Sequence, residues 1–342
     1  MTNIEKSVIK YQIDFEKYKN GQCNEIIALL DSANSDISKY IRKTTSISTK
    51  KRYTEIARKL RDIAQTLKEN VGKETDVDAI IEYELKKQKS ILKSVKDSIK
   101  KSKGLTVDFL YPSTEQIKTS ALFKPVGDNM TYQSYLDGIE AGLYNTWDSA
   151  IRTGYLTGIP TKEIVENVIG GVSQSQKLAN LGSINAFRNS VYSNTRTVLQ
   201  SFANETQRRI YEDNEKYLGE ENEYKFEFLS TLDTRTCLTC GELSGKLFKS
   251  IADAPRLPLH RGCRCVIIPY YNIENDVKAS KNGYVNADTS FEHWLNEQNE
   301  ETQKEVLGVT RFNLFKNGVA IKDFVDNGQV LNLKQIKEKL LF

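Results

Sequence analysis

Apolar residues recur every three or four positions along much of the first 220 residues. One series is formed by Tyr53, Ile56, Leu60, Ile63 and Leu67, another by Val77, Ile80, Ile81 and Leu85, and a third by Ile139, Leu143, Trp147 and Ile151. This spacing places apolar side chains on one face of a helix, and Thr75-Asp76 supplies a helix cap. We predict an N-terminal helical region over residues 1–105 and a second helical part over residues 131–220. The second part contains a long helix from Ile184 to about Tyr217.

The pattern breaks between these two regions. Tyr111-Pro112 and Lys124-Pro125-Val126-Gly127 interrupt the helical spacing, and such dipeptides are typical of turns and loops. We therefore predict a linker over residues 106–130.

Hydrophobic spacing changes to a period of two near Tyr224. Tyr224, Phe226 and Phe228 alternate with charged residues, and Leu247-Phe248 and Cys265-Val266-Ile267-Ile268 are further short apolar runs. Alternation of this kind is typical of strands. It predicts a small β element over residues 221–275.

The remaining residues, 285–342, predict a C-terminal helical segment. Thr289-x-x-Glu292 and Thr302-x-x-Glu305 match the capping-box pattern, and Leu333, Ile336 and Leu340 mark a final helix. The predicted fold class is therefore α+β and predominantly α-helical. Long helices flank a small β element that is held together by a Cys/His metal-binding knot.

Composition excludes several classes of protein. The 342 residues contain no run of the roughly 18 to 20 apolar residues that a membrane helix needs, and the chain does not start like a secretory signal. We expect a soluble protein made in a cytoplasm. Its 49 basic and 45 acidic residues leave a net charge of only +4, which does not identify a nucleic-acid binder.

One helix is nevertheless rich in lysine. Its basic residues are Lys86, Lys87, Lys89, Lys93, Lys96, Lys100, Lys101 and Lys103. They form either a solvated helix face or a contact surface for the DNA backbone or an acidic partner.

Four of the five cysteines fall between Cys237 and Cys265. The pattern is C-x-x-C, about twenty residues, and then H-x-x-C-x-C; its members are Cys237, Cys240, His260, Cys263 and Cys265. Zinc takes four such ligands in a closed structural site, so five candidates compete for four positions. Cys237, Cys240 and Cys263 are the first choices, and the fourth ligand is His260 or Cys265. We predict structural zinc.

Other roles for these cysteines stay open at this stage. They could be buried thiols, disulfides that form in an oxidising particle, or a redox pair. Cys23, alone in a helical region, is predicted to be a small core residue.

Catalytic zinc has little support in the sequence. The H-x-E…P-C-x-x-C pattern of deaminases and the H-E-x-x-H pattern of metalloproteases are both absent, and His260 and His293 are the only histidines. We therefore predict no enzymatic activity. Zinc would stabilise a β element of some fifty residues that is too small to be stable without it.

The ordered motifs resemble the core of the phage Mu F-like minor head proteins, the head-morphogenesis family of tailed bacteriophages. The motifs are Leu232-Asp233-Thr234-Arg235-Thr236-Cys237-x-x-Cys240, Leu243-Ser244-Gly245-Lys246-Leu247-Phe248 and Pro258-x-His260-x-x-Cys263-Arg264-Cys265. Arg196-Thr197 is similar to a family Arg-Thr position. Further similarity lies in Phe291-x-x-Trp294-Leu295, Val306-Leu307-Gly308-x-x-Arg311-Phe312-x-Leu314-Phe315 and Gly318. The resemblance covers roughly residues 140–340.

The resemblance implies a low-copy minor capsid protein of the virion, assembled in the host cytoplasm. Its expected partners are the portal protein and other head proteins, and its expected roles are head assembly at the portal vertex and DNA packaging or ejection. Asp233, Arg235 and Arg264 either pair within the loops or grip a partner or the DNA backbone.

Proteins of this family also occur fused to toxin domains. The alternative function is therefore a toxin-type enzyme such as an ADP-ribosyltransferase attached to a minor head domain. Its E-x-E pair would be Glu82-x-Glu84 or Glu221-x-Glu223.

Overall fold

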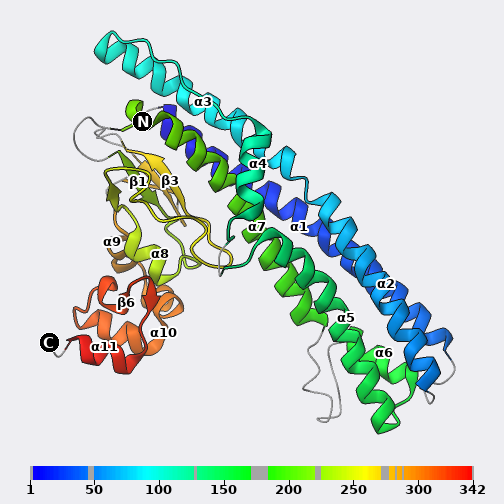
Figure 1. Ribbon diagram of the computed structural model, residues 1–342. Coiled ribbons are helices and arrows are strands. Elements are labelled where there is room, and N and C mark those ends of the chain that lie inside the picture. The colour runs from blue at the N-terminus through cyan, green and yellow to red at the C-terminus, as the bar shows by residue number, and fades with distance from the viewer. Residues whose placement is uncertain are drawn as a thin grey trace.

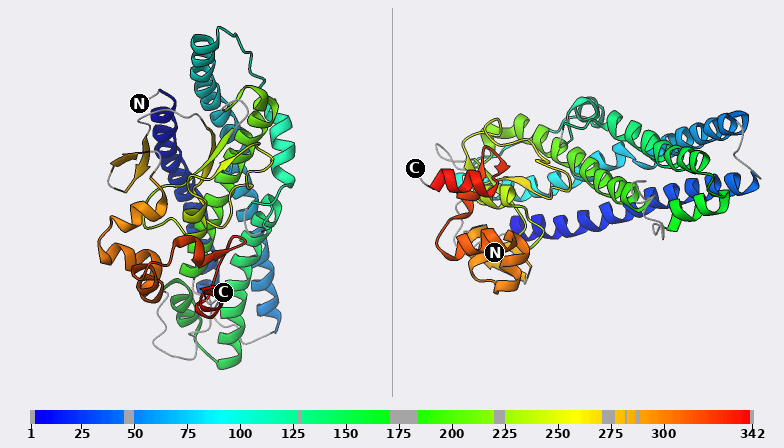
Figure 2. Two further views of the ribbon diagram at one scale, coloured as in Figure 1. Left: turned by 90° about the vertical axis from the view of Figure 1, so that its left-hand side faces the viewer. Right: turned by 90° about the horizontal axis from the view of Figure 1, so that it is seen from below.

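The computed structural model describes residues 3–44, 50–126, 129–170, 184–219, 225–270, 277–281, 283–286 and 289–340. Figure 1 shows an elongated bundle of helices with a small sheet and a group of short C-terminal helices beside one end of it. Both views in Figure 2 show the same arrangement. The fold is α+β and predominantly α-helical, as predicted.

Long amphipathic helices form the bundle. In the described part of the chain they are α1 (Asn3–Lys43), α2 (Lys50–Glu74), α3 (Val77–Lys103), α4 (Thr114–Phe123), α5 (Tyr132–Thr157), α6 (Thr161–Gly170) and α7 (Ile184–Asn214), which continues into the 3₁₀ helix η2 (Glu215–Tyr217). Asp76 caps α3 by accepting a hydrogen bond from the Ala79 N–H, as the sequence predicts. α2 packs on α1 and α5, while α3 packs on α1 and α7.

The two predicted helical regions share one hydrophobic core. Leu30 of α1, Trp147 of α5 and Phe202 of α7 are all buried in the same cluster. The Trp147 indole N–H also donates to Asn34 Oδ1 at 2.9 Å, which ties α5 to α1. Because each helix has only one apolar face, residues 1–105 and 131–220 bury their apolar surface largely against each other.

The segment predicted as a linker contains a helix, α4. Ser113 and Gln116 form a capping box at its start, and Ile117 and Ala121 are buried against the bundle. The prediction of a linker over 106–130 is therefore wrong for Thr114–Phe123. The cause is that only a short apolar stripe follows the Tyr111-Pro112 break, too short to register as a helical period.

A three-stranded antiparallel sheet lies next to α7. Its strands are β1 (Phe226–Leu229), β2 (Leu247–Phe248) and β3 (Val266–Pro269), in the order β2-β1-β3. The short helix α8 (Leu238–Leu243) follows β1, and β4 (Val277–Ser280) pairs with β5 (Gly283–Asn286) in a separate hairpin. The predicted strands are confirmed, except that Tyr224 lies outside the described residues. The Phe226 ring contacts the Tyr211 ring of α7 at 5.6 Å between centroids, which anchors β1 on the bundle.

The C-terminal segment has a hydrophobic core of its own. Its elements are α9 (Phe291–Asn296), α10 (Glu300–Lys316), the 3₁₀ helix η3 (Ile321–Phe324), β6 (Val325–Asp326), β7 (Gln329–Val330) and α11 (Leu333–Leu340). Leu232 and Leu238, from the segment around the cysteines, are buried in this second core together with Phe291 and Trp294. Cys240, Cys263 and Cys265 belong to the core of the bundle instead. The cysteine-bearing segment is thus the junction of two cores.

Both predicted capping boxes of this segment are wrong in position. Ser290, not Thr289, caps α9, and Asn299 caps α10 by accepting from the Thr302 N–H. Ser and Asn are better N-caps than Thr, so each helix starts at the stronger cap rather than at the residue that fits the motif. The final helix is confirmed as α11. No helix within the described residues is both long and apolar enough to cross a membrane.

A pair of glycine substitutions tests the contact between the two cores. A Cβ at Gly241 in α8 would overlap the buried Phe291 ring, whereas a Cβ at Gly138 in α5 would meet nothing within 4 Å. Gly241→Ala should lower the free energy of unfolding by about 1–3 kcal/mol and speed hydrogen exchange in α9. Gly138→Ala should raise it by about 0.5–1 kcal/mol. Equal effects of the two substitutions in denaturant titrations would contradict this packing.

Candidate metal centre

The C-x-x-C pair opens helix α8. Cys237 is the N-cap of the helix, and its Sγ accepts a hydrogen bond from the Cys240 N–H at an N···S distance of 3.4 Å. Since N-cap and N3 side chains lie on the same side of a helix start, the two thiols face one point. The C-x-x-C pair thus forms the first turn of a helix.

The H-x-x-C pair lies on a tight turn that is anchored to α7. The Cys263 N–H donates to the His260 carbonyl at 3.1 Å. Gly262 has a φ of +76°, a conformation that favours glycine. Its N–H donates to Thr197 Oγ1 at 2.8 Å, and Thr197, on α7, is a buried residue. Thr197 is the threonine of the Arg-Thr position, so this hydrogen bond gives that position a structural role.

These two pairs meet at one place, although some twenty residues separate them. The His260 Nε2 atom lies 3.2 Å from Cys237 Sγ and 3.2 Å from Cys240 Sγ, and Cys240 Sγ lies 4.0 Å from Cys263 Sγ. Sulfurs bound to one tetrahedral zinc are about 3.8 Å apart, as follows from a Zn–S bond of about 2.3 Å. The spacing of the ligand atoms therefore suits one metal ion.

Cys240 is common to two groups of ligand atoms. Cys237, Cys240 and His260 form one group, and Cys240, Cys263 and Cys265 form the other; within each, all ligand atoms lie within 4.8 Å of one another. All four cluster cysteines carry free thiols. The structure thus brings together every candidate ligand named from the sequence.

The imidazole of His260 is oriented to act as a ligand. Its Nδ1 atom lies 2.9 Å from the Arg261 carbonyl oxygen, which can only accept a hydrogen bond. Nδ1 therefore carries a proton, and Nε2, which faces two thiols, is the nitrogen left to bind a metal. Cys265, the residue before β3, is buried, and its Sγ lies within 4.8 Å of those of Cys240 and Cys263.

Protons are unevenly distributed over the cluster. Hydrogen bonding with Cys240 lowers the pKa of Cys237 to about 4, and hydrogen bonding with Cys237 and Cys263 raises the pKa of His260 to about 11. The pKa of Cys263 is lowered by its hydrogen bonds with Cys240 and Cys265. The protein thus concentrates thiolate charge beside a cationic imidazole. A metal ion would displace that proton and take up the same charge.

Asp233 and Arg264 form an ion pair beside the cluster. Arg264 Nη2 lies 2.6 Å from Asp233 Oδ1, and Nη1 lies 2.8 Å from Oδ2, so the pair is bidentate. Both side chains are mostly buried. The Arg235 N–H also donates to Asp233, and the exposed Arg235 guanidinium lies 3.5 Å from Asp233 Oδ2. Pairing within the loops, one of the two predicted roles, is therefore confirmed for Asp233, Arg235 and Arg264.

One anchor of the centre was not predicted from the sequence. Arg208 of α7 donates to the carbonyls of Ile251 and Ala254, at 2.7 and 3.2 Å, and thereby holds the loop that leads from β2 to His260. An arginine on a long helix gives no sequence signal that separates this role from an ordinary surface position.

The proposed transferase glutamates are not equivalent. Glu82 is exposed, while Glu84 is buried and accepts hydrogen bonds from Gln88 and Tyr11. Burial raises the pKa of Glu84. The second E-x-E, at residues 221–223, lies outside the described residues. This arrangement gives the transferase hypothesis no support from α3.

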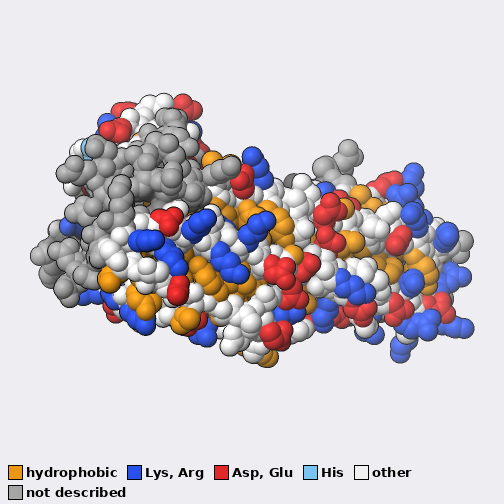
Figure 3. Space-filling view, turned by 90° about the horizontal axis from the view of Figure 1, so that it is seen from above, with side chains coloured by type: hydrophobic (Ala, Val, Ile, Leu, Met, Phe, Trp, Pro, Cys, Tyr) orange, Lys and Arg blue, Asp and Glu red, His pale blue; other side chains and the backbone are white. Residues whose placement is uncertain are grey.

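The lysines of α3 differ in their surroundings: some are buried or paired, and others are exposed. Lys87 is mostly buried, with Nζ 2.7 Å from the centroid of the Tyr11 ring, and Lys96 pairs with Asp108 at 2.6 Å. Lys86, Lys93 and Lys100 are exposed, and the side chains of Lys101 and Lys103 lie outside the description. Figure 3 shows basic and acidic side chains interspersed along the face of the molecule that is seen from above. Cys23 is fully buried, as predicted.

Comparison with known protein families, with curated proteins and with solved structures finds no match to this chain.

The ion pair predicts an acid-dependent loss of stability. Burial alone would raise the pKa of Asp233, but the hydrogen bonds and charge of Arg264 hold it below its usual value. Asp233→Asn should therefore cost about 3 kcal/mol at neutral pH because it leaves Arg264 unpaired. A carboxylate with a lowered pKa stabilises the fold above about pH 4, so the cost should shrink as the pH falls below that value.

The matched control is Glu338→Gln on α11, whose carboxylate lies 3.8 Å from Lys334 on the surface. It should change the free energy of unfolding by less than about 0.5 kcal/mol. Urea titrations between pH 3 and 7 measure both variants. A cost for Asp233→Asn that is the same at both ends of this range would refute the assignment.

Proposed function

We propose that this chain is a structural and morphogenetic minor head protein of a tailed bacteriophage, of the phage Mu F-like type. The observation that carries the proposal is that the ordered motifs of residues 232–265 converge on one knot. Within it Asp233 pairs with Arg264, the C-x-x-C pair opens α8, and the His260 turn completes the cluster. The Asp, Arg, Cys and His residues of these motifs each make a contact within the knot.

We further propose that the knot holds zinc. Three thiols and an imidazole nitrogen are the donors that zinc prefers, and they fit a closed tetrahedral site. The proposed ligands are Cys237, Cys240, His260 and Cys263, because Nε2 of His260 faces two of the thiols. Cys265 then packs against the site as a buried thiol. Zinc would act as a crosslink between α8 and the turn before β3.

In this proposal the protein acts in head assembly at the portal vertex. Its partners are the portal protein and other head proteins, and exposed lysines such as Lys86, Lys93 and Lys100 can meet the DNA backbone during packaging or ejection. The protein would be assembled in the host cytoplasm and retained in the virion. A crosslinked knot at the junction of two cores suits a protein that must present a fixed surface to other subunits.

Metal analysis of ligand variants tests the zinc site. Protein purified under reducing conditions should contain about one zinc ion per chain, with three cluster thiols protected from alkylation. His260→Ala should lose the ion and several kcal/mol of stability, while the matched variant Cys265→Ala should keep it. The reverse pattern would make Cys265 the fourth ligand. Full zinc content in both variants and in Cys237→Ser would exclude the site.

Analysis of purified particles tests the role in the head. Quantitative mass spectrometry of virions from the phage that encodes the chain should detect it at far fewer copies than the major capsid protein. Complementation with a Cys237→Ser, Cys240→Ser double variant should yield particles that lack the protein, whereas Cys265→Ala should be incorporated normally. Particles that assemble and infect without any copy of the chain would refute the proposal.

A further inference from the structure

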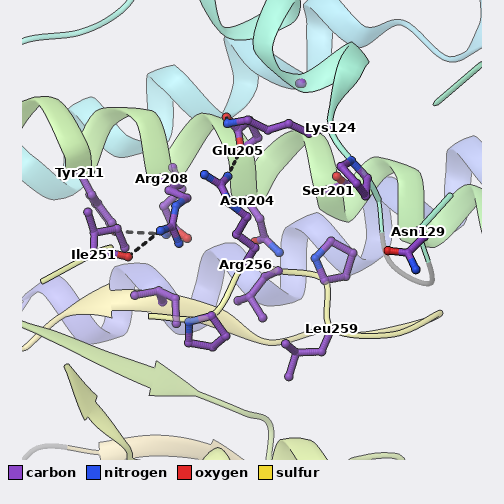
Figure 4. Close-up of a pocket in the computed structure, with 17 residues that line it drawn as sticks. Lys124, Asn129, Ser201, Asn204, Glu205, Arg208, Tyr211, Ile251, Arg256 and Leu259 are labelled. Atoms are coloured by element: carbon purple, nitrogen blue, oxygen red, sulfur yellow. Dashed lines mark hydrogen bonds and ion pairs between the residues drawn. The ribbon is translucent and has the colours of Figure 1, made fainter. Parts of the chain in front are cut away.

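A pocket in the described part of the chain lies apart from the cysteine cluster. It has a volume of about 480 Å³ and is lined by residues of α7, the end of α4 and the loop at residues 251–259. Figure 4 shows Arg208 extending from α7 to Ile251 of this loop, and Arg256 extending from the loop toward Glu205, which lies beside Lys124. Volumes of this size are typical of small-molecule sites. None of the five Cys/His residues lines it.

Cations outnumber carboxylates at the pocket. Glu205 is buried and pairs with Lys124 and with Arg256, whose Nη1 lies 3.5 Å from its Oε2. Glu212 likewise pairs with two cations, Arg208 at 3.2 Å and Arg209 at 3.1 Å. Each carboxylate is therefore shared by two cations. The side chain of Arg256 is 60% exposed, so it can exchange Glu205 for a ligand.

A buried amide in the wall lacks an acceptor. Lys19 Nζ can only donate, so Gln200 must turn its Oε1 toward it, at 2.6 Å. Gln200 then donates through Nε2 to Asn204 Oδ1 at 3.0 Å. This relay fixes the Asn204 amide with its Nδ2 donor directed away from Gln200, and that donor has no hydrogen-bond partner. Asn204 is 93% buried and lines the pocket, and an unpaired donor there is costly.

Much of the rest of the wall is apolar, although Asn129, Ser201, Gln207 and Tyr211 also line it. The apolar part includes Pro125, Ile251, Pro255, Leu257, Pro258 and Leu259. A ligand that satisfies this pocket needs negative charge for the excess of cations, an oxygen acceptor for the amide, and an apolar body for the prolines and leucines. Inorganic phosphate offers no apolar surface.

We propose that this pocket binds a monocarboxylate with a branched apolar body. Arg256 turns from Glu205 to pair with one carboxylate oxygen, and the other oxygen accepts a hydrogen bond from Asn204 Nδ2. The apolar body packs on the prolines of the loop. The ligand is a free organic acid or the C-terminal residue of a polypeptide, since both offer this chemistry. The inference does not depend on the metal centre or on a role in the phage head.

Calorimetric titration of the full-length protein tests the site with N-acetyl-leucine as the probe. It should bind, and N-acetyl-leucinamide, which has the same body without the charge, should bind about tenfold more weakly or worse. Inorganic phosphate should compete poorly. No binding of N-acetyl-leucine at millimolar concentration, or equal binding of the amide, would overturn the proposal.

Two variants locate the binding. Asn204→Asp keeps the acceptor for Gln200 but replaces the unpaired donor with a carboxylate oxygen, so it should lose at least about tenfold in affinity. Arg256→Gln, at an exposed position, should do the same without affecting folding. Arg58→Gln, exposed on α2 and outside the pocket, is the charge-matched control. Unchanged affinity in Arg256→Gln would refute the site even if Asn204→Asp fails to fold.

A third probe distinguishes a free organic acid from the C-terminus of a polypeptide. A tripeptide, N-acetyl-Gly-Gly-Leu with a free carboxyl end, should bind more tightly than N-acetyl-leucine if the pocket receives a polypeptide terminus, because the extra backbone extends along the open side. Equal or weaker binding of the tripeptide indicates a free acid. If Arg256→Gln leaves the affinity for both probes unchanged, neither a free acid nor a polypeptide C-terminus binds as proposed.

Discussion

The contact between the first turn of α8 and the turn at His260 is the constraint on which the second half of the molecule depends. Cys237 and Cys240 meet His260 and Cys263 at distances of 3.2 to 4.0 Å between ligand atoms, and this meeting point lies between two hydrophobic cores. On one side the cysteines are part of the core of the bundle; on the other, Leu238 enters the core of the C-terminal segment. Short strands of two to four residues cannot fix such a junction by themselves. A metal crosslink at this point, as proposed, would therefore stabilise two interfaces at once.

The helical bundle contributes to the centre from a distance. Thr197 holds the backbone of Gly262 and Arg208 holds two carbonyls of the loop that precedes His260, so α7 supports the site through hydrogen bonds rather than through ligands. Such anchors keep the ligand-bearing turns at fixed positions before any ion arrives. Arg264 and Asp233 add a third fixed contact, from β3 to the segment before α8.

The sequence was sufficient for features with a strong local signal and insufficient where several signals compete. The period of α2, α3 and α5, the alternation of β1 and the spacing of the cysteines predicted helix, strand and cluster. The cap of α9 was missed by one residue and that of α10 by three, because Ser290 and Asn299 are stronger caps than the threonines that match the motif. α4 was missed because burial against the bundle stabilises a ten-residue helix that has little pattern of its own. The choice between His260 and Cys265 depends on a tautomer, which follows from the Arg261 carbonyl and not from spacing.

The shared core of the bundle has a consequence for how such a protein can evolve. The motifs lie in residues 140–340, yet Arg196 of α7 is bonded to Glu16 and Asn20 of α1, and Lys19 of α1 is bonded to Gln200 of α7. Recombination that replaced the N-terminal helices would leave these charged and polar groups of α7 without partners inside the bundle. The N-terminal helices are therefore not an exchangeable module. They must change together with α7, so divergence in the first hundred residues has to be accompanied by matching substitutions along one face of that helix.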